Sequence, residues 1–105
     1  MRSVLVHQNG VTRGVEAVDP AWLAPGAPEV LWVNIDGPTE DDRPLLEETF
    51  HFHDLAVEDA LAARHHPKIE SYEGFLYLIL HELAPLEDRR GAQTQDIDFF
   101  LGRNY

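Results

Sequence analysis

Two adjacent carboxylates, Glu58 and Asp59, are the residues whose type and spacing best fit metal chemistry. They lie in the stretch 52–61, which has the apolar spacing of a short helix, and Pro67 follows, which cannot continue one. Neighbouring helical residues point about 100° apart, so one carboxylate can lie against the domain while the other faces solvent or a second subunit. Carboxylate oxygens suit hard cations such as Mg²⁺, which keeps most of its waters. On spacing alone the pattern favours a solvated helix edge, with a cation site as the alternative.

Histidines form a second candidate ligand set: His51, His53, His65, His66 and His81. In an extended chain the first two would share one side, as a transition-metal pair requires. No third ligand follows at a firm spacing, and the sequence has no cysteine. We therefore expect His53 near the helix start, and the pair at 65 and 66 as solvated residues that complement the C-terminal end of the helix dipole.

The motifs of the common enzyme classes are missing from the sequence. Ser3 and Ser71 are its only serines, and neither lies in a Gly-x-Ser-x-Gly turn. No glycine-rich phosphate-binding motif occurs either. Nineteen acidic residues offer many accidental carboxylate pairs, but the spacing singles out none as catalytic. We expect no enzymatic activity, and a metal-dependent enzyme ranks last among the alternatives.

Length and charge set broad limits on what the chain can be. Its 105 residues predict one domain, 1–105, and 44% hydrophobic residues allow one core without disulfides. A net charge of -11 disfavours nucleic acid and anionic membranes. On charge alone it is typical of a surface that keeps the chain soluble, with binding of cations or a basic partner as the alternative. No secretory leader opens the sequence, and the longest apolar run, 75–80, is far shorter than the roughly 20 residues of a spanning helix. We expect a soluble polypeptide that does not itself insert into a membrane.

The first half of the chain predicts strands joined by tight turns. Two short segments, 4–6 and 11–15, flank Asn9-Gly10, a dipeptide that favours a hairpin turn. One helical turn is expected at 21–23, after Asp19-Pro20. The run 30–35 is apolar on both faces except at Asn34, which predicts a buried strand.

Two helices are expected in the middle of the chain. The first begins after Thr39 and carries an apolar stripe: Leu45, Leu46, Thr49 and Phe50. The second runs from about Asp54, its expected cap, to Ala63. Its core candidates are Leu55, Val57 and Leu61.

Strands return at the end of the chain. The run 75–83 is apolar on both faces at first, which predicts a central strand, and 97–101 is its expected antiparallel neighbour. The polar segment 84–94 is expected to be an exposed connection. Strands, two helices and further strands predict an α/β (α+β) layered domain with a mixed β-sheet. An end directly after a strand is also expected of a fragment cut from a longer protein.

Taken in order, four segments resemble the cytoplasmic N-terminal domain of the CorA family of divalent-cation transporters. They are Trp32–Gly37, Phe52–Leu61, His66–Tyr72 and Asp98–Tyr105. The resemblance covers roughly residues 30 to 105. It implies an α/β/α layered domain below a homopentameric channel at the cytoplasmic face of the membrane. The stalk helix and two membrane helices of that family, the first ending in Gly-Met-Asn, do not occur in this sequence.

The resemblance also implies a role for the two adjacent carboxylates. Family members bind regulatory Mg²⁺ between neighbouring cytoplasmic domains, and the acidic residue that matches Asp59 takes part, with Glu58 beside it. The partner carboxylate lies in the stalk. The resemblance therefore predicts a metal-sensing domain of a Mg²⁺/Co²⁺ transporter, with a weak site between subunits. A free-standing acidic protein-interaction domain of similar fold is the alternative.

The chain departs from the family pattern at two places. Asp54 replaces a proline that the family usually has, and either residue suits a helix start. His65 and His66 replace the Gln-Arg that often precedes the Pro-Lys of the family. That second change leaves open which of Mg²⁺, Co²⁺, Ni²⁺ or Zn²⁺ is handled.

Overall fold

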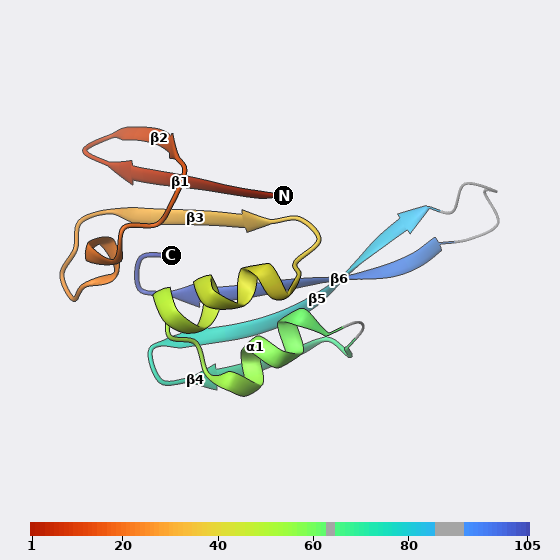
Figure 1. Cartoon of the computed structure of the whole chain (residues 1–105). Coiled ribbons are helices and arrows are strands. Elements are labelled where there is room, and N and C mark those ends of the chain that lie inside the picture. Colours follow the sequence, from red (N-terminus) through yellow and green to blue (C-terminus); the bar gives the residue numbers. More distant parts are fainter. Residues whose placement is uncertain (63–64, 86–91) are drawn as a thin grey trace.

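The computed structural model describes residues 1–62, 65–85 and 92–105, and their strands form two sheets (Figure 1). The first sheet has the order β2-β1-β3 and the second β4-β5-β6. Every strand pair in both sheets is antiparallel. The predicted α+β class is therefore confirmed, but the expected single mixed sheet is wrong. Antiparallel hairpins need only short turns, and sequence neighbours pair in three of the four cases.

The first sheet forms around the predicted hairpin. β1 (Arg2–Gln8) and β2 (Val11–Val15) are joined at Asn9 and Gly10, whose φ angles are 54° and 74°. Positive φ at both turn positions is what an Asn-Gly turn supplies. β3 (Val30–Ile35) pairs with the other side of β1. The strand is present as expected, but it is not buried on both faces, because Trp32 is 64% exposed.

Short helical segments lie in the connections between the strands. The predicted turn after Asp19 is confirmed as the 3₁₀ helix η1 (Pro20–Leu23). A second 3₁₀ turn, η2 (Glu40–Asp42), is capped by Thr39. A π-helical turn, η3 (Leu45–Thr49), follows. Both leucines of η3 are buried, as the apolar stripe predicted.

The helix α1 (Asp54–Leu61) carries the two candidate carboxylates. The expected cap at Asp54 is wrong, because Nδ1 of His53 accepts the hydrogen bond from the Leu55 N–H at 3.1 Å. Leu55 is also 60% exposed, although its apolar side chain suggested a core position. Ala56 and Val57 face the core instead, and the backbone N–H of Ala62 closes the helix. The predicted end at residue 63 lies outside the described residues.

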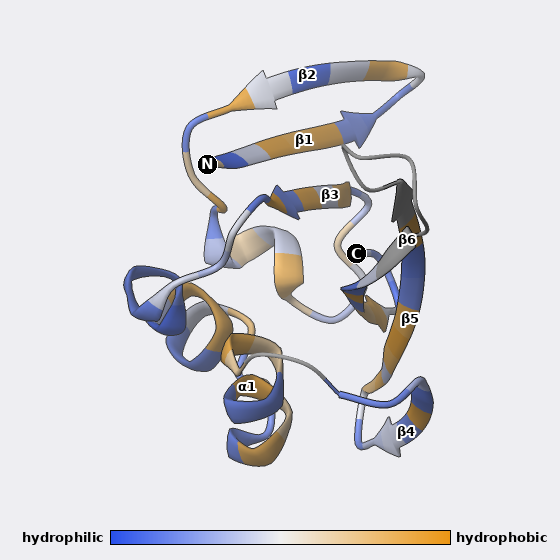
Figure 2. Ribbon diagram, turned by 90° about the vertical axis from the view of Figure 1, so that its right-hand side faces the viewer, coloured by the Kyte–Doolittle hydropathy of each residue, from blue (hydrophilic) through white to orange (hydrophobic). Residues whose placement is uncertain are grey.

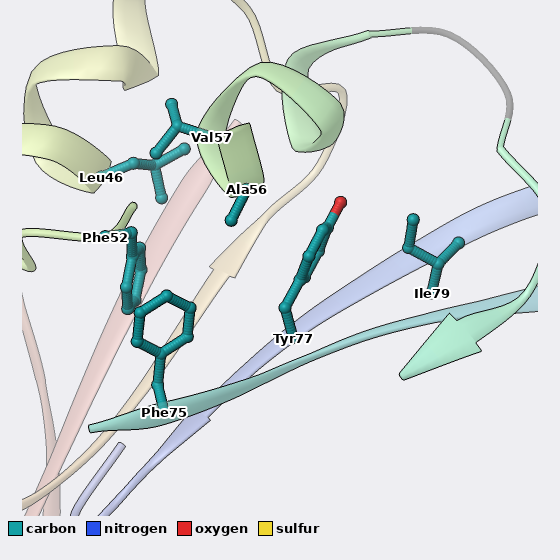
Figure 3. Packing of buried hydrophobic residues seen from close by; sticks show 7 residues of the cluster. All are labelled: Leu46, Phe52, Ala56, Val57, Phe75, Tyr77 and Ile79. Carbon is teal, nitrogen blue, oxygen red and sulfur yellow. The ribbon is translucent and has the colours of Figure 1, made fainter. Parts of the chain in front are cut away.

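The second sheet supplies the main wall of the core. β4 (Lys68–Tyr72) and β6 (Ala92–Gly102) flank β5 (Phe75–Pro85), so the predicted central strand and its antiparallel neighbour are confirmed. β5 ends at Pro85 and β6 begins at Ala92, so the connection between them is shorter than the expected 84–94. Residues 86–91 lie outside the described part. Alternate residues of β5 pack against the helices, in a cluster formed by Leu46, Phe52, Ala56, Val57, Phe75, Tyr77 and Ile79 (Figure 3).

The helical segments lie on one side of the second sheet (Figure 2). The opposite face is apolar and open: Ile69, Leu76, Leu80, Ile97, Phe99 and Leu101 are all between 37% and 68% exposed. The central strand β5 is therefore covered on one face only in the described chain. In the three described ranges, the helices cover one face of this sheet, so the second helical layer of an α/β/α arrangement is not among them.

Asn104 and Tyr105, which follow the last strand, contact residues of the first sheet and of the core. Asn104 is buried, its Nδ2 donates to the carbonyls of Trp22 (2.7 Å) and Glu29 (2.8 Å), and its own carbonyl accepts from the Leu31 N–H (2.8 Å). The ring of Tyr105 meets the Phe50 ring edge-on, with centroids 5.0 Å apart. The chain after β6 thereby fixes the position of β3 relative to the core beneath α1.

Candidate metal site

The helix α1 separates the two adjacent carboxylates, as their sequence positions predicted. Ala56 and Val57 are fully buried and fix the orientation of the helix on the sheet. Glu58 is exposed, whereas the side chain of Asp59 keeps only 28% of its surface accessible. One acid therefore faces solvent and the other leans toward β4.

Asp59 meets a lysine from the second sheet. Nζ of Lys68 lies 2.8 Å from Oδ2 of Asp59 and 2.6 Å from Oε1 of Glu70. The same ammonium is 5.9 Å from the centroid of the Tyr77 ring, within cation–π range. Hydrogen bonds to Asp59 first, and to Glu70 second, hold the pKa of Lys68 well above its usual range. The ammonium thus stays charged at neutral pH and links α1 to β4.

A second polar pair lies deeper in the same region. The hydroxyl of Tyr77 donates to Oδ2 of Asp98, and the tyrosine is completely buried (Figure 3). Burial raises the pKa of the Asp98 carboxyl, while the hydrogen bond from Tyr77 and the charge of His65 act in the opposite direction. Burial is likewise the main reason that the pKa of Tyr77 is raised. Strand alternation places both residues on the helix-facing side of their strands, which is the signal that sequence analysis missed.

Comparison with known proteins identifies the type of domain that carries these carboxylates. The profile of the CorA-like Mg²⁺ transporter protein family matches residues 28–105, which is more than half of the chain. The chain belongs to the CorA-like Mg²⁺ transporter family. This is a transporter family rather than an enzyme family, in agreement with the missing catalytic motifs.

A curated relative supports the same assignment. The chain is 32% identical over 91 residues to a putative metal ion transporter, YfjQ, of Bacillus subtilis (strain 168). The match covers 87% of this chain but 25% of the relative, so the chain spans about a quarter of that protein's length. Within the described ranges, every helix is too short or too polar to cross a bilayer.

The donor atoms at Asp59 fit the cations of a CorA-like protein. Glu58, Asp59 and Glu70 supply carboxylate oxygens, the ligands that Mg²⁺ prefers. Among the described residues, no group of three or more histidine, aspartate or glutamate side chains is arranged to hold a metal ion. A cation that keeps most of its waters needs only one or two protein carboxylates. Asp59 and Glu58 therefore supply carboxylate oxygens that suit Mg²⁺, but the described residues around them form no complete metal-binding group.

The histidines lie elsewhere in the structure. His53 caps α1, and His51 is exposed with a φ of 57°. Three others, with Thr94 and Asp96, line a depression of about 250 Å³: His65, His66 and His81. The expectation that residues 65 and 66 complement the helix dipole is wrong, because α1 ends at Leu61 and the backbone N–H of His65 donates to Asp96.

Proposed function

We propose that this chain is the metal-sensing regulatory domain of a longer CorA-like transporter. In this proposal Asp59, supported by Glu58, contributes to a weak Mg²⁺ site between neighbouring subunits of a homopentamer. The observation that carries the proposal is the partly accessible carboxylate of Asp59 beside the exposed carboxylate of Glu58 on α1, in a chain whose family is that of Mg²⁺ transporters. The domain would lie at the cytoplasmic face of the cell membrane.

The net charge of -11 gives the site a regulatory consequence. Five acidic domains brought together repel one another, and the repulsion is strongest where carboxylates of adjacent subunits meet. Divalent cations bound between the domains offset that repulsion and favour the closed assembly. Their loss at low Mg²⁺ concentration favours opening, as a population shift driven by differential cation binding.

The identity of the cation follows from the ligands that the neighbouring subunit adds. Carboxylates alone favour Mg²⁺, whereas an added imidazole favours Co²⁺, Ni²⁺ or Zn²⁺. The carboxylates of α1 support Mg²⁺ as the regulatory cation. Co²⁺ enters the proposal as an ion transported by the longer protein, as the family resemblance implies.

The test uses a longer transporter that contains this domain. Mg²⁺ is titrated while protection of the cytoplasmic domains from limited proteolysis is followed. Asp59→Ala should raise the Mg²⁺ concentration needed for half-maximal protection by about tenfold, which corresponds to about 1.4 kcal/mol. Glu73→Ala is the matched control, because Glu73 is an exposed acid in the turn between β4 and β5. Equal Mg²⁺ dependence in the two variants would remove Asp59 from the mechanism.

A further inference from the structure

We propose that Lys68 is an internal competitor for Asp59, which divalent cations must displace, so that Lys68 sets the cation concentration at which the domain responds. This inference rests on the proposed function, because it concerns the same carboxylate. It concerns a residue of this chain that would tune the site rather than ligate the metal.

The geometry places the ammonium where a cation would approach Asp59. Nζ of Lys68 contacts Oδ2 of Asp59 at 2.8 Å, and the two side chains keep 35% and 28% of their surfaces accessible. Solvent ions can therefore reach the pair from outside. Divalent cations and the ammonium seek the same carboxylate oxygens, and both cannot neutralise one oxygen at full strength.

Lys68 competes strongly because it belongs to the same chain as Asp59. Lys68 is fixed in β4, so its ammonium is presented to Asp59 at an effective concentration of about millimolar or higher. A divalent cation must exceed that local competition before it occupies the carboxylate. Weak apparent affinity is the expected result, and weak affinity suits a sensor of an abundant cation.

Glu70 provides a second position for the displaced lysine. Its Oε1 lies 2.6 Å from Nζ of Lys68. When a cation takes Asp59, Lys68 keeps this carboxylate and the nearby ring of Tyr77. The ammonium is not left unpaired, which lowers the free energy needed to release Asp59.

The experiment measures Mn²⁺ binding to the longer transporter that contains this domain, by the electron paramagnetic resonance signal of free Mn²⁺. Mn²⁺ is the probe because it accepts the same oxygen ligands as Mg²⁺. Lys68→Met should bind about tenfold more tightly than the unmodified chain. Arg43→Met is the matched control, because it removes one positive charge but releases Glu40 and Glu47 instead. Lys68→Arg should keep the weak affinity of the unmodified chain, and Lys68→Gln gives the same test as Lys68→Met with a polar side chain.

Asp59→Asn in the Lys68→Met background should remove the gain. Equal affinity in Lys68→Met and Arg43→Met would overturn the inference, since net charge alone would then explain the change. A gain that survives Asp59→Asn would also overturn it, by placing the cation elsewhere. The proposed function has a separate outcome: Asp59→Asn in the otherwise unmodified chain lowers Mn²⁺ affinity if Asp59 is a ligand, whatever Lys68 does.

Discussion

The hydroxyl of Tyr77 donates a hydrogen bond of 2.5 Å to Oδ2 of Asp98 beneath the helix that carries the candidate site. Tyr77 comes from β5 and Asp98 from the neighbouring strand β6. The bond satisfies two polar groups that burial would otherwise leave without water. It therefore lets a strand rich in apolar residues place a carboxylate beneath α1.

Tyr77→Phe should destabilise the chain by about 1–3 kcal/mol, because it leaves the Asp98 carboxylate without its donor. The loss should grow as the pH rises from about 4 to 7, since the hydroxyl stabilises the charged form of Asp98. Below the unfolded pKa of about 3.9 the carboxyl is protonated in both states and needs the donor less. Urea unfolding at several pH values measures this difference. A deficit that is constant with pH would contradict the assignment of the hydrogen bond.

Asp42 is expected to make the chain sensitive to acid. A hydrogen bond from the Thr39 N–H, followed by one from Arg2, holds the pKa of this buried carboxyl below its usual range. A lowered folded pKa contributes stability above the unfolded value of about 3.9, and that stability is lost as the pH falls through the folded pKa.

Asp42→Asn should therefore cost about 2 kcal/mol at pH 7 and flatten the loss of stability on acidification. The estimate is below the value for a fully buried pair, because the Arg2 side chain is about a third exposed. Urea midpoints at pH 7 and in acid check both parts. An unchanged acid dependence would show that Asp42 does not control it.

The position of the Tyr105 ring is expected to require a glycine at residue 102. A Cβ atom at residue 102 would overlap the Tyr105 ring, whose edge packs against Phe50. Gly102→Ala should displace the ring and destabilise the chain by about 1–3 kcal/mol, as overpacking does. Gly14→Ala is the matched control in a strand, because its Cβ would meet only Leu5 Cδ2 at 4.0 Å. Equal unfolding midpoints of the two variants would show that the ring moves at little cost.

Local sequence signals predicted the elements of this fold well. Asn9-Gly10 predicted the first hairpin, and the apolar run from residue 75 predicted the central strand. The capping residue was harder to predict, because the imidazole of His53 takes the position that aspartate usually fills. Which residue caps the helix depends on the direction in which the backbone enters it.

Long-range placement was the part that the sequence could not supply. Trp32 and Leu80 lie in apolar runs, but such a run does not say whether a second layer covers its outer face. The contact between Asp59 and Lys68 likewise depends on how α1 meets β4, nine residues further along the chain. The sequence predicted that one of the two acids faces the domain and the other faces outward, but not which one. In the structure Asp59 is the acid that faces the domain.

The most direct test of the account locates a bound cation on the chain itself. Mn²⁺ is added in small amounts to the ¹⁵N-labelled protein, and the loss of amide signal near the paramagnetic ion is recorded for each residue. If α1 carries the proposed site, signal loss centres on Glu58 and Asp59 and is reversed by excess Mg²⁺. Signal loss spread evenly over the acidic surface, or centred on another group of carboxylates, would contradict the central claim that α1 carries the metal site.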